Sequence, residues 1–383
     1  MDKIKVYHFH NGTGGGVLSV IRNLLQFSSC ALIENHVIHT INKNVVKEYT
    51  VENLKGAASE QVFYYSQGWN FHYTCTQLAK LLPDEKAVIV THDWLELGMV
   101  SNLGLQNPVV TFLHGDYVYY YQLAQLHQDA IDTFVTVAGN IEKNLQLFLP
   151  SRENDIVYLR FPVPGNPGIR MQKSGYDIAF VGRLSAGKGY HILPSIESIL
   201  KRNNIQITWH IIGKEQNDLK VTWDTESNTC FYGNLGNEKV NQLLLKMDFF
   251  ILPSIAEGMP VTLVEAMKAG AIPLVNNIDG GIQELVVNNH TGYKIESNEP
   301  AGYAKKIIAV IADVNLKKLL QHNARDTANS LFDEKINTKL IEEKIINVAG
   351  SERKIKPVKK IYGSRLDKKW VPNSFTSLVR SLK

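Results

Sequence analysis

Short apolar runs rich in β-branched residues alternate with longer amphipathic segments along this chain of 383 residues. The amphipathic segments that fall between the runs include residues 17–27, 71–82, 190–202 and 238–247. Alternation of this kind predicts an α/β fold with parallel sheets covered by helices on both faces. The runs that we predict to be strands are residues 3–10, 36–41, 61–66, 87–93, 109–115, 133–138 and 156–161 in the first half, and 177–183, 207–213, 229–234, 249–254, 272–277 and 293–295 in the second.

A segment rich in Pro and Gly, near residues 161–176, separates the two sets of strands and has no apolar periodicity. We therefore expect two doubly wound domains, residues 1–164 and 165–350. Residues 351–383 would follow as a basic segment with a helix that crosses back to the first domain. Ligands of such sheets bind beyond the carboxyl ends of the strands, so we expect the active site in the cleft between the domains.

The composition is that of an ordinary globular protein, with 44% hydrophobic and 20% charged residues. Three distant cysteines suggest neither a disulfide framework nor a zinc site, and a reducing, cytoplasmic setting fits best. We find no signal peptide and no apolar run long enough to span a membrane. No D-x-D pair is present to hold Mg²⁺ or Mn²⁺ against a diphosphate, so we expect no metal and no cofactor.

The net charge of +4 is unevenly distributed, because residues 351–383 hold ten Lys or Arg and only two acids. This tail is either a solvated surface helix or, through residues 353–369, a contact with anionic membrane. The enzyme would then be peripheral on the inner face of the membrane. Binding to nucleic acid is not expected, because the basic charge is confined to the tail and lacks an interleaved aromatic platform.

A glycine-rich loop, Asn11 to Gly16, follows the first predicted strand. Such a loop brings backbone N–H groups close to a phosphate in front of a helix N-terminus, or it is simply a tight turn. A dinucleotide fingerprint would require Gly at position 17, where Val17 stands, and an acid after the second strand. A P-loop is excluded as well, since no G-K-[ST] follows.

Two cations follow the strand 177–183, namely Arg183 at its end and Lys188 across a glycine-containing turn. They are either a surface pair or two cations on one diphosphate, each attracting it by about 4 kcal/mol near the protein surface. The segment 254–267 then turns into a helix near Pro260, whose free N–H groups around Met259, Val261 and Thr262 predict an anion site. Its carboxylates Glu257 and Glu265 are offset along the ligand.

Several of these segments resemble glycosyltransferase family 4, whose members have the GT-B fold. The matches are FVGRLSAGKG, the EGMPVTLVEAM segment with its E-x7-E spacing, the following GG-x-x-E at Gly280, Gly281 and Glu284, and NHTGYKI at 289–295. The resemblance is dense from about 177 to 296. In the first half it is carried mainly by the glycine loop and by TFLHG. One departure is that Val17 and Leu18 follow the glycines, where the family often has Glu-Arg.

The resemblance implies a role for each matching residue. Arg183 and Lys188 would bind the donor diphosphate, with Gly15 and Gly16 approaching its phosphates. Glu257 and Gly258 would contact the transferred sugar, Glu265 the ribose, and a loop with Tyr232 and Gly233 the base. His114 would lie against the donor sugar, so that the catalytic set is His114, Glu257, Arg183 and Lys188.

The family retains the anomeric configuration, and the resemblance therefore implies a retaining, metal-independent hexosyltransferase that uses a UDP- or GDP-sugar. We favour same-face substitution over a covalent intermediate, for which Asp93 and Asp116 are candidate nucleophiles. The expected acceptor is a glycan or a lipid-linked glycan of bacterial surface polysaccharide or lipopolysaccharide, and Tyr117, Tyr119, Tyr120 and Tyr121 either stack on it or form the core and rim of a helix. The alternatives are a nucleotide-sugar epimerase and a non-catalytic binder of sugar nucleotides.

Overall fold

The computed structural model shows two compact units, each built on one parallel sheet. Unit 1 comprises Met1–Pro162 and Lys335–Lys383, and unit 2 comprises Val163–Glu334. The structure describes residues 3–13, 15–51, 53–83, 86–166, 168, 175–215, 221–224, 226–297, 299–352, 355–361 and 363–382. Much of the expected linker and the basic residues Arg353, Lys354 and Lys383 lie outside these ranges.

Within the described residues, unit 1 contains a seven-stranded sheet in the order β3-β2-β1-β4-β5-β6-β7, and all its pairs are parallel. Its central strands are almost continuously buried, as expected for a sheet covered on both faces, whereas the edge strands β3 and β7 are only partly buried. The strands are β1 (Ile4–His10), β2 (Ile33–Asn42), β3 (Ser59–Tyr65), β4 (Val88–Thr91), β5 (Val109–Leu113), β6 (Thr133–Thr136) and β7 (Ile156–Tyr158).

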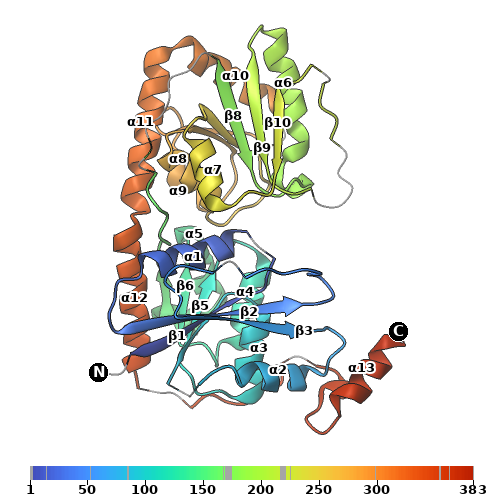
Figure 1. The fold of residues 1–383 in the computed structure, drawn as a ribbon. Helices are drawn as coiled ribbons and strands as arrows, with labels where there is room; N and C mark the ends of the chain where they lie inside the picture. The colour runs from blue at the N-terminus through green and yellow to red at the C-terminus, as the bar shows by residue number, and fades with distance from the viewer. Residues whose placement is uncertain are drawn as a thin grey trace. The chain divides into compact units, whose positions relative to one another are not determined.

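The helices of unit 1 connect these strands and lie on both faces of the sheet (Figure 1). Right-handed crossovers place α1 on one face and the helices that follow β4 on the other, because the strand order reverses between β1 and β4. The helices are α1 (Gly16–Phe27), α2 (Phe71–Ala79), α3 (Trp94–Leu103), α4 (Val118–His127) and α5 (Gly139–Phe148), with a 3-10 helix at Pro150–Asp155.

Unit 2 repeats this plan with a six-stranded parallel sheet over its described residues, in the order β10-β9-β8-β11-β12-β13. The strands are β8 (Tyr176–Val181), β9 (Ile207–Ile212), β10 (Thr229–Gly233), β11 (Phe249–Leu252), β12 (Ile272–Asn276) and β13 (Tyr293–Ile295). The helices are α6 (Leu193–Arg202), α7 (Asn237–Leu244), α8 (Val261–Lys268), α9 (Ile282–Leu285), α10 (Pro300–Ala312) and α11 (Val314–Leu331), with 3-10 turns at Ala186–Lys188 and Tyr190–Ile192.

One face of the unit 2 sheet carries a continuous apolar core. Trp209 and Phe249 from the sheet pack there with Leu193 of α6 and Tyr303 of α10. Helices α7, α8 and α11 pack together. Helix α8 follows β11, which lies beyond the reversal in strand order, so a right-handed crossover places it on the opposite face of the sheet from α6. The predicted α/β class with two doubly wound parallel sheets is therefore confirmed, and each predicted strand is present.

Both sheets reverse their strand order at the first strand of the unit, between β1 and β4 in unit 1 and between β8 and β11 in unit 2. At such a point the two neighbouring loops leave in opposite directions and open a crevice beyond the carboxyl ends of the strands. Residues that follow β1 and β4, and residues that follow β8 and β11, are therefore the first candidates for a site in each unit.

The chain passes between the units twice, at Pro162/Val163 and at Glu334/Lys335, and the unit 2 sides of both passages meet at one side chain. The Nζ atom of Lys268, at the end of α8, donates to the carbonyl oxygens of Val163 (2.6 Å) and Phe332 (2.9 Å). Lys268 is buried, and burial lowers its pKa. These bonds join the two passages to the helix that begins beside β11.

The C-terminal part of the chain, from α12 (Glu334–Gly350) onward, packs with unit 1. Ser28 donates to Glu342 of α12 at 2.5 Å, and Ile341 and Ile345 are buried. The sequence predicts that the second domain extends to residue 350, so the return to the first unit at Lys335 comes about sixteen residues earlier than expected. An apolar stripe shows that a helix is buried, but not which sheet buries it.

Beyond α12 the chain runs along unit 1 to a 3-10 turn (Arg365–Asp367) and helix α13 (Asn373–Ser381). Lys356 is buried here and donates to Asn107 O (2.6 Å) and Asp132 Oδ2 (2.5 Å), while Lys359 pairs with Asp129 at 3.2 Å. Part of the basic tail is thus committed to internal contacts. Among the described residues, no helix combines the length and the apolar character that crossing a bilayer requires.

Candidate active site

The loops that follow β8 and β11 are joined at the point where the unit 2 sheet reverses. The N–H of Ile255 donates to the carbonyl of Gly187 at 3.1 Å. Gly189 has a φ of +70°, and a Cβ atom there would lie 2.0 Å from the carbonyl oxygen of Pro253. Only glycine fits both the left-handed backbone and this close approach, so G-K-G in the first loop is what lets the second loop pack against it.

Lys188 and Glu257, predicted from separate motifs, form an ion pair across these two loops. The Nζ atom of Lys188 donates to Oε1 of Glu257 at 2.5 Å. The Glu257 side chain is 8% exposed and that of Lys188 is 22% exposed. Charge-assisted bonds of this length are strong, and the partial exposure of Lys188 leaves it accessible to a ligand. Arg183 lies in the first of these loops with an exposed side chain.

Helix α8 starts within one residue of the predicted position. Its N-cap is Pro260, which provides no capping side chain, and the N–H of Leu263 bonds to the Pro260 carbonyl at 3.1 Å. Helical geometry leaves the N–H groups of Val261 and Thr262 without intrahelical acceptors. Their partial positive charge makes the start of α8, beside the Lys188–Glu257 pair, a suitable place for an anion.

Glu265 lies inside α8, on its fifth residue, and is buried. Asn237, the first residue of α7, donates to its Oε1 at 3.4 Å. Glu257 precedes the helix and Glu265 lies one turn within it, so the two carboxylates are offset along α8 as the E-x7-E spacing predicted.

The GG-x-x-E motif supports the same loop from behind. Gly280 has a φ of +118°, and its Cβ would lie 2.5 Å from the carbonyl oxygen of Glu257. Gly281 donates its N–H to the Gly258 carbonyl at 2.7 Å, and a Cβ there would lie 2.5 Å from Met259 Cε. The two glycines thus set the position of residues 257–259, and Met259 is buried as a result.

Tyr232 and Gly233 are the last residues of β10, as the apolar run 229–234 predicted, and do not lie in the loop that the resemblance implied. This strand is separated from β8 by β9, so it stands two strands away from the reversal point. The Tyr232 hydroxyl bonds to His210 Nδ1 at 2.8 Å, and His210 Nε2 bonds to Asp177 Oδ1 at 2.6 Å. The phenol is already engaged, whereas Gly233 is exposed at the strand end.

In unit 1, Gly15 and Gly16 stand at the start of helix α1, at the end of the loop that follows β1. Gly15 is the N-cap with a φ of 93°, and no other atom lies within 4 Å of the position of a Cβ on it. Its conformation, rather than close packing, requires glycine. The two residues are placed at the carboxyl end of β1, where the unit 1 sheet reverses, as a phosphate-binding loop requires.

His114 follows β5 and bonds through Nε2 to Nδ1 of His92, which follows β4, at 2.8 Å. Burial lowers the pKa of His114 to about 4, so the imidazole is neutral at pH 7. Burial and the neighbouring His114 hold the pKa of His92 well below its ordinary value. The pair therefore offers hydrogen bonds without positive charge. Sequence reasoning found His114 and missed His92.

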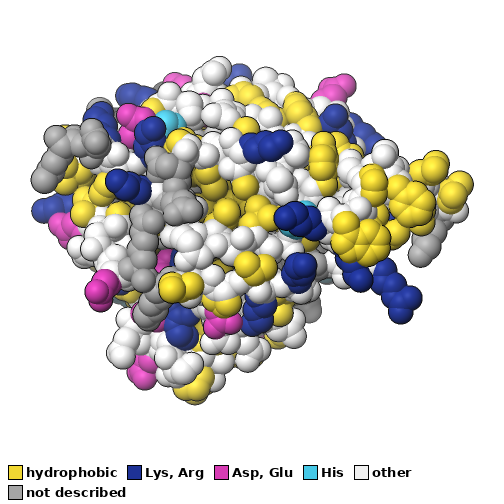
Figure 2. Space-filling model, turned by 90° about the horizontal axis from the view of Figure 1, so that it is seen from below, with side chains coloured by type: hydrophobic (Ala, Val, Ile, Leu, Met, Phe, Trp, Pro, Cys, Tyr) yellow, Lys and Arg dark blue, Asp and Glu magenta, His cyan; other side chains and the backbone are white. Residues whose placement is uncertain are grey.

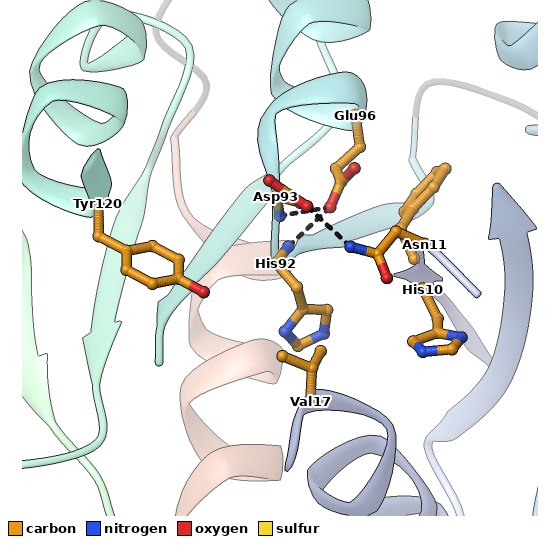
Figure 3. Close-up of a pocket in the computed structure, with 8 residues that line it drawn as sticks. His10, Asn11, Val17, His92, Asp93, Glu96 and Tyr120 are labelled. Atoms are coloured by element: carbon orange, nitrogen blue, oxygen red, sulfur yellow. Dashed lines mark hydrogen bonds between the residues drawn. The ribbon is translucent and has the colours of Figure 1, made fainter. Parts of the chain in front are cut away.

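A pocket lies beside this pair at the reversal point of unit 1 (Figure 3). Its volume is about 50 Å³, which is room for a few water molecules or part of a sugar. Figure 3 shows His92 and Tyr120 turned towards it from two sides. The lining residues are Phe9, His10, Asn11, Val17, His92, Asp93, Glu96 and Tyr120.

Burial favours the neutral forms of three titratable groups of this pocket, His10, His92 and Glu96. Burial, followed by the nearby His39, lowers the pKa of His10 to about 3. Burial and the neighbouring Asp93 raise the pKa of Glu96 to about 8. The buried Nε2 atoms of His10 and His92 have no hydrogen-bond partner among the described residues. Such a pocket suits a neutral hydroxyl-bearing group better than a phosphate, because the hydroxyl can satisfy these nitrogens without bringing charge.

Of the two carboxylates considered as nucleophiles, only Asp93 lines the pocket. It accepts from Asn11 Nδ2 at 2.9 Å and from the Tyr119 hydroxyl at 2.5 Å. Asp116 instead accepts from the Tyr121 hydroxyl and from Asn140 Nδ2 (2.6 Å), which ties α4 to α5.

The four tyrosines divide between helix packing and the surface. Tyr121 is buried in α4, whereas Tyr117 and Tyr119 are exposed, which agrees with the core and rim of a helix. Only Tyr120 faces the pocket.

The unit 1 pocket carries the residues that sequence reasoning missed. His10 is the last residue of β1, Asn11 and His92 directly follow β1 and β4, and Glu96 lies in the first turn of α3. The signal was available in the HFHN and THDW strings. Pairing β1 with β4 is what brings them together, and a strand order cannot be read from one sequence. Within the described ranges, no group of three or more His, Cys, Asp or Glu is placed to hold a metal ion.

Comparison with known proteins agrees with this arrangement. Residues 169–327 match the family model of glycosyl transferases group 1, and this range covers the two loops of unit 2. The glycogen synthase of Mycobacterium tuberculosis is 28% identical over 214 residues, which are 53% of this chain and 51% of that protein. The capsular polysaccharide biosynthesis glycosyltransferase CapM of Staphylococcus aureus is 25% identical over 178 residues, 44% of this chain and 45% of CapM.

An Escherichia coli UDP-Gal:alpha-D-GlcNAc-diphosphoundecaprenol alpha-1,3-galactosyltransferase is 28% identical over 164 residues, 41% of each chain. The chain thus spans about half the length, or less, of these curated relatives.

Solved structures extend the likeness to nearly the whole chain. Anabaena Alr3699/HepE, solved with UDP and glucose, has a TM-score of 0.70 at 15% identity and covers 90% of this chain and 100% of its own. The pneumococcal O-GlcNAc transferase GtfA, solved with UDP and GlcNAc, has a TM-score of 0.75 at 12% identity, covering 92% and 100%. The chain has the GT-B fold of these glycosyltransferases, and the sequence matches support a glycosyltransferase whose group 1 segment is residues 169–327.

Proposed function

We propose that this chain is a retaining, metal-independent hexosyltransferase of family 4 that uses a UDP- or GDP-sugar as donor. The match to glycosyl transferases group 1 supports sugar transfer. The relatives named above support a nucleotide-sugar donor, and UDP is the nucleotide in the HepE and GtfA structures. The E-x7-E and G-K-G motifs carry the assignment to family 4.

The observation that carries the proposal is the 2.5 Å ion pair of Lys188 and Glu257 beside the open start of α8. The diphosphate of a donor is a stronger partner for Lys188 than a single carboxylate. We infer that it takes Lys188 and leaves the Glu257 carboxylate free to accept hydrogen bonds from the sugar hydroxyls. The change of partner by Lys188, from Glu257 to the diphosphate, would then couple diphosphate binding to sugar binding.

Departure of the diphosphate is the step in which these groups act. Arg183, Lys188 and the N–H groups of Met259, Val261 and Thr262 stabilise the negative charge that develops on the leaving oxygen. That oxygen takes the proton from the acceptor hydroxyl, which attacks the anomeric carbon from the same face. The C–O bond to the diphosphate breaks and the glycosidic C–O bond forms with retained configuration.

The remaining donor contacts follow the resemblance. Glu265 accepts from the ribose hydroxyls, Gly233 with the backbone of Tyr232 lies against the base, and Gly258 leaves room for the sugar. Gly15 and Gly16 approach the phosphates, and His114 contacts the transferred sugar. The neutrality of His114 supports this role, because a neutral imidazole donates to or accepts from a hydroxyl with no charge to desolvate.

The acceptor that we propose is a glycan or a lipid-linked glycan of bacterial surface polysaccharide or lipopolysaccharide synthesis. The names of CapM and the diphosphoundecaprenol galactosyltransferase support a substrate of this class. A covalent intermediate on Asp93 is the competing route to retention, since this carboxylate lines the unit 1 pocket.

Product analysis by NMR tests the reaction. The chain is incubated in EDTA with α-linked UDP- and GDP-hexoses, with and without polyprenyl-diphosphate sugars, and the anomeric signals are followed. We expect an α-linked product and loss of turnover by about 100-fold in Glu257→Gln, with Glu238→Gln on exposed α7 as the matched control. A new nucleotide sugar without acceptor would instead identify an epimerase, a β-linked product would exclude retention, and activity only with added metal would contradict metal independence.

A further inference from the structure

The C-terminal helix α13 is attached to unit 1 by its polar side. Asn70 donates its backbone N–H to Asn373 at 2.8 Å, and Thr376 donates its hydroxyl to the Leu366 carbonyl at 2.9 Å. Arg380 reaches the Trp69 carbonyl at 2.5 Å and Asp367 at 2.6 Å. Thr376 is the buried residue of this helix. A helix of a soluble protein normally buries its apolar stripe, so this attachment is inverted.

The apolar stripe of α13 consequently faces outward. Phe375, Leu378 and the following Leu382 are spaced by three and four residues, and their exposed fractions are 54%, 60% and 79%. Trp370, just before the helix, is 75% exposed. Figure 2 shows apolar side chains gathered at the protruding end of unit 1 that carries α13, with Lys and Arg side chains beside them. Contiguous exposed apolar surface of this kind marks an interaction site.

The charge around this stripe is of one sign. Arg365, Lys368 and Lys369 are exposed, and Lys368 lies over the ring of Trp370 with its Nζ 5.6 Å from the ring centroid. Asp367 is the one acid among residues 355–361 and 363–382. It forms an ion pair with Arg380 and accepts a hydrogen bond from the N–H of Phe71, each at 2.6 Å. Its charge is therefore compensated within the protein, and the net field around the stripe is positive.

We propose that Trp370, Phe375, Leu378 and Leu382, with Arg365, Lys368 and Lys369, form a docking face for an anionic lipid bilayer. The face goes beyond the proposed sugar transfer and needs none of its residues. An amphipathic helix that is basic at its edges and apolar on its outer side lies in the interfacial plane, with Trp at the headgroup level. Helix α13 is too short to span the membrane, and docking would be reversible.

The same observations disfavour other occupants. A second copy of the chain would bring its own Arg365, Lys368 and Lys369 against these residues, and like charges oppose such a contact. A nucleic acid would satisfy the basic side chains but would leave Phe375, Leu378 and Leu382 exposed, because phosphates offer no apolar partner. Hydrocarbon and anionic headgroups together match both halves of the face.

The residues proposed here to bind the membrane differ from the segment 353–369 that the sequence suggested. Lys356 and Lys359 are paired with Asp132 and Asp129, so they are not available as the free cations that the sequence suggested. The docking face lies farther along the chain, between residues 365 and 382, and its apolar half was not part of the charge argument.

Co-sedimentation of the full chain with vesicles tests the proposal. Vesicles of phosphatidylcholine with 30% phosphatidylglycerol are compared with pure phosphatidylcholine at low and physiological salt. We expect binding to the anionic vesicles only, weakened by salt. The triple variant Arg365→Gln/Lys368→Gln/Lys369→Gln should lose on the order of 100-fold in partitioning, about fivefold per charge. The apolar variant Phe375→Ser/Leu378→Ser should lose binding as well.

A matched control separates this face from general stickiness. The variant Leu147→Ser/Val45→Ser removes two apolar side chains from elsewhere in unit 1. They are 80% and 62% exposed, which is at least as much as Phe375 and Leu378. This variant should bind the vesicles like the unmodified chain. Because Phe375 and Leu378 are more than half exposed, their variant should keep its melting temperature. Binding that survives the apolar variant but not the charge variant would indicate a general polyanion site and overturn the proposal. So would no binding at all, or a dimer that the apolar variant converts to monomer.

Discussion

At the scale of single residues, the two candidate sites differ in how their charges are handled, because one pairs them and the other suppresses them. In unit 2, Lys188 and Glu257 form an ion pair at 2.5 Å. In unit 1, burial favours the neutral form of each group instead. It raises the pKa of Glu96 to about 8, and it lowers the pKa of His10 to about 3 and that of His114 to about 4. The two sites are therefore electrostatically opposite, one suited to an anion and the other to a neutral hydroxylated group.

The raised pKa of Glu96 predicts a pH dependence of stability. Its folded-state pKa lies above the unfolded value of 4.5, so the folded chain binds the extra proton, and this stabilisation is lost as pH rises through about 8. Below about pH 7.5 the buried histidines act in the opposite sense, because they are protonated in the unfolded chain and neutral in the folded one. The contribution of Glu96 is therefore the difference in the free energy of unfolding between the unmodified chain and Glu96→Gln, and this difference should fall as pH rises to about 8.

The variant Glu96→Gln mimics the protonated carboxyl and should lack this part of the slope. Urea unfolding of both proteins at several pH values measures it, with Glu238→Gln as the exposed control. Equal slopes for the unmodified chain and Glu96→Gln would show that the buried carboxyl is ionised throughout the range.

At the scale of elements, the site of unit 2 is a set of loops held in place by glycine. Gly189 admits the Pro253 carbonyl, and Gly280 and Gly281 admit the backbone of residues 257 and 258. Each contact lies between two loops that follow different strands of the sheet. The glycines therefore act through packing, and their function is to position Glu257 beside Lys188.

Gly281→Ala tests this positioning. The added Cβ would lie 2.7 Å from the Gly258 carbonyl and 2.5 Å from Met259 Cε, so the loop with Glu257 must shift. We expect donor affinity to fall about tenfold or more, since overpacking typically costs 1–3 kcal/mol. Calorimetric titration with the nucleoside diphosphate measures it.

Gly236→Ala is the matched control, because no atom lies within 4 Å of its Cβ position. If Gly281→Ala bound the donor as tightly as this control, the loop would not be held by the glycine pair.

The strands and helices could be predicted from the sequence. Buried parallel strands appear as short, continuous apolar runs, whereas helices appear as longer segments in which apolar residues recur every three or four positions. Lys188, Glu257 and Glu265 could be predicted as well, since each belongs to a motif with fixed spacing. The strand at Tyr232 could be predicted as well, but the bond of its hydroxyl to His210 could not, because the order of the strands cannot be read from one sequence. The unit against which α12 packs could not be predicted either, because the apolar stripe of this helix would fit against the sheet of either unit.

At the scale of the whole molecule, one helix links the donor loops to the two passages of the chain. Helix α8 starts beside Glu257 and ends at Lys268, whose Nζ holds the carbonyls of Val163 and Phe332. Both passages between unit 1 and unit 2 are thus anchored at the far end of the helix that is proposed to face the diphosphate.

Lys268→Met should destabilise the protein, because it removes the ammonium group that donates to the carbonyl oxygens of Val163 and Phe332. We expect a loss on the order of 3 kcal/mol, typical of breaking a buried charged contact from one side. Chemical unfolding measures the loss, with exposed Lys305→Met of α10 as control. A free energy of unfolding unchanged by Lys268→Met would mean that water replaces the ammonium at no cost.

The central claim is that Lys188 and the start of α8 hold the diphosphate of a nucleotide sugar without metal. Calorimetric titration in EDTA with UDP, GDP, ADP and CMP tests it most directly, on the unmodified chain, on Lys188→Met and on Lys239→Met as the exposed control. We predict that UDP or GDP binds, that Lys188→Met weakens it about 100-fold or more, and that Lys239→Met does not. Absence of binding by every nucleotide, or equal affinity in Lys188→Met, would contradict the account.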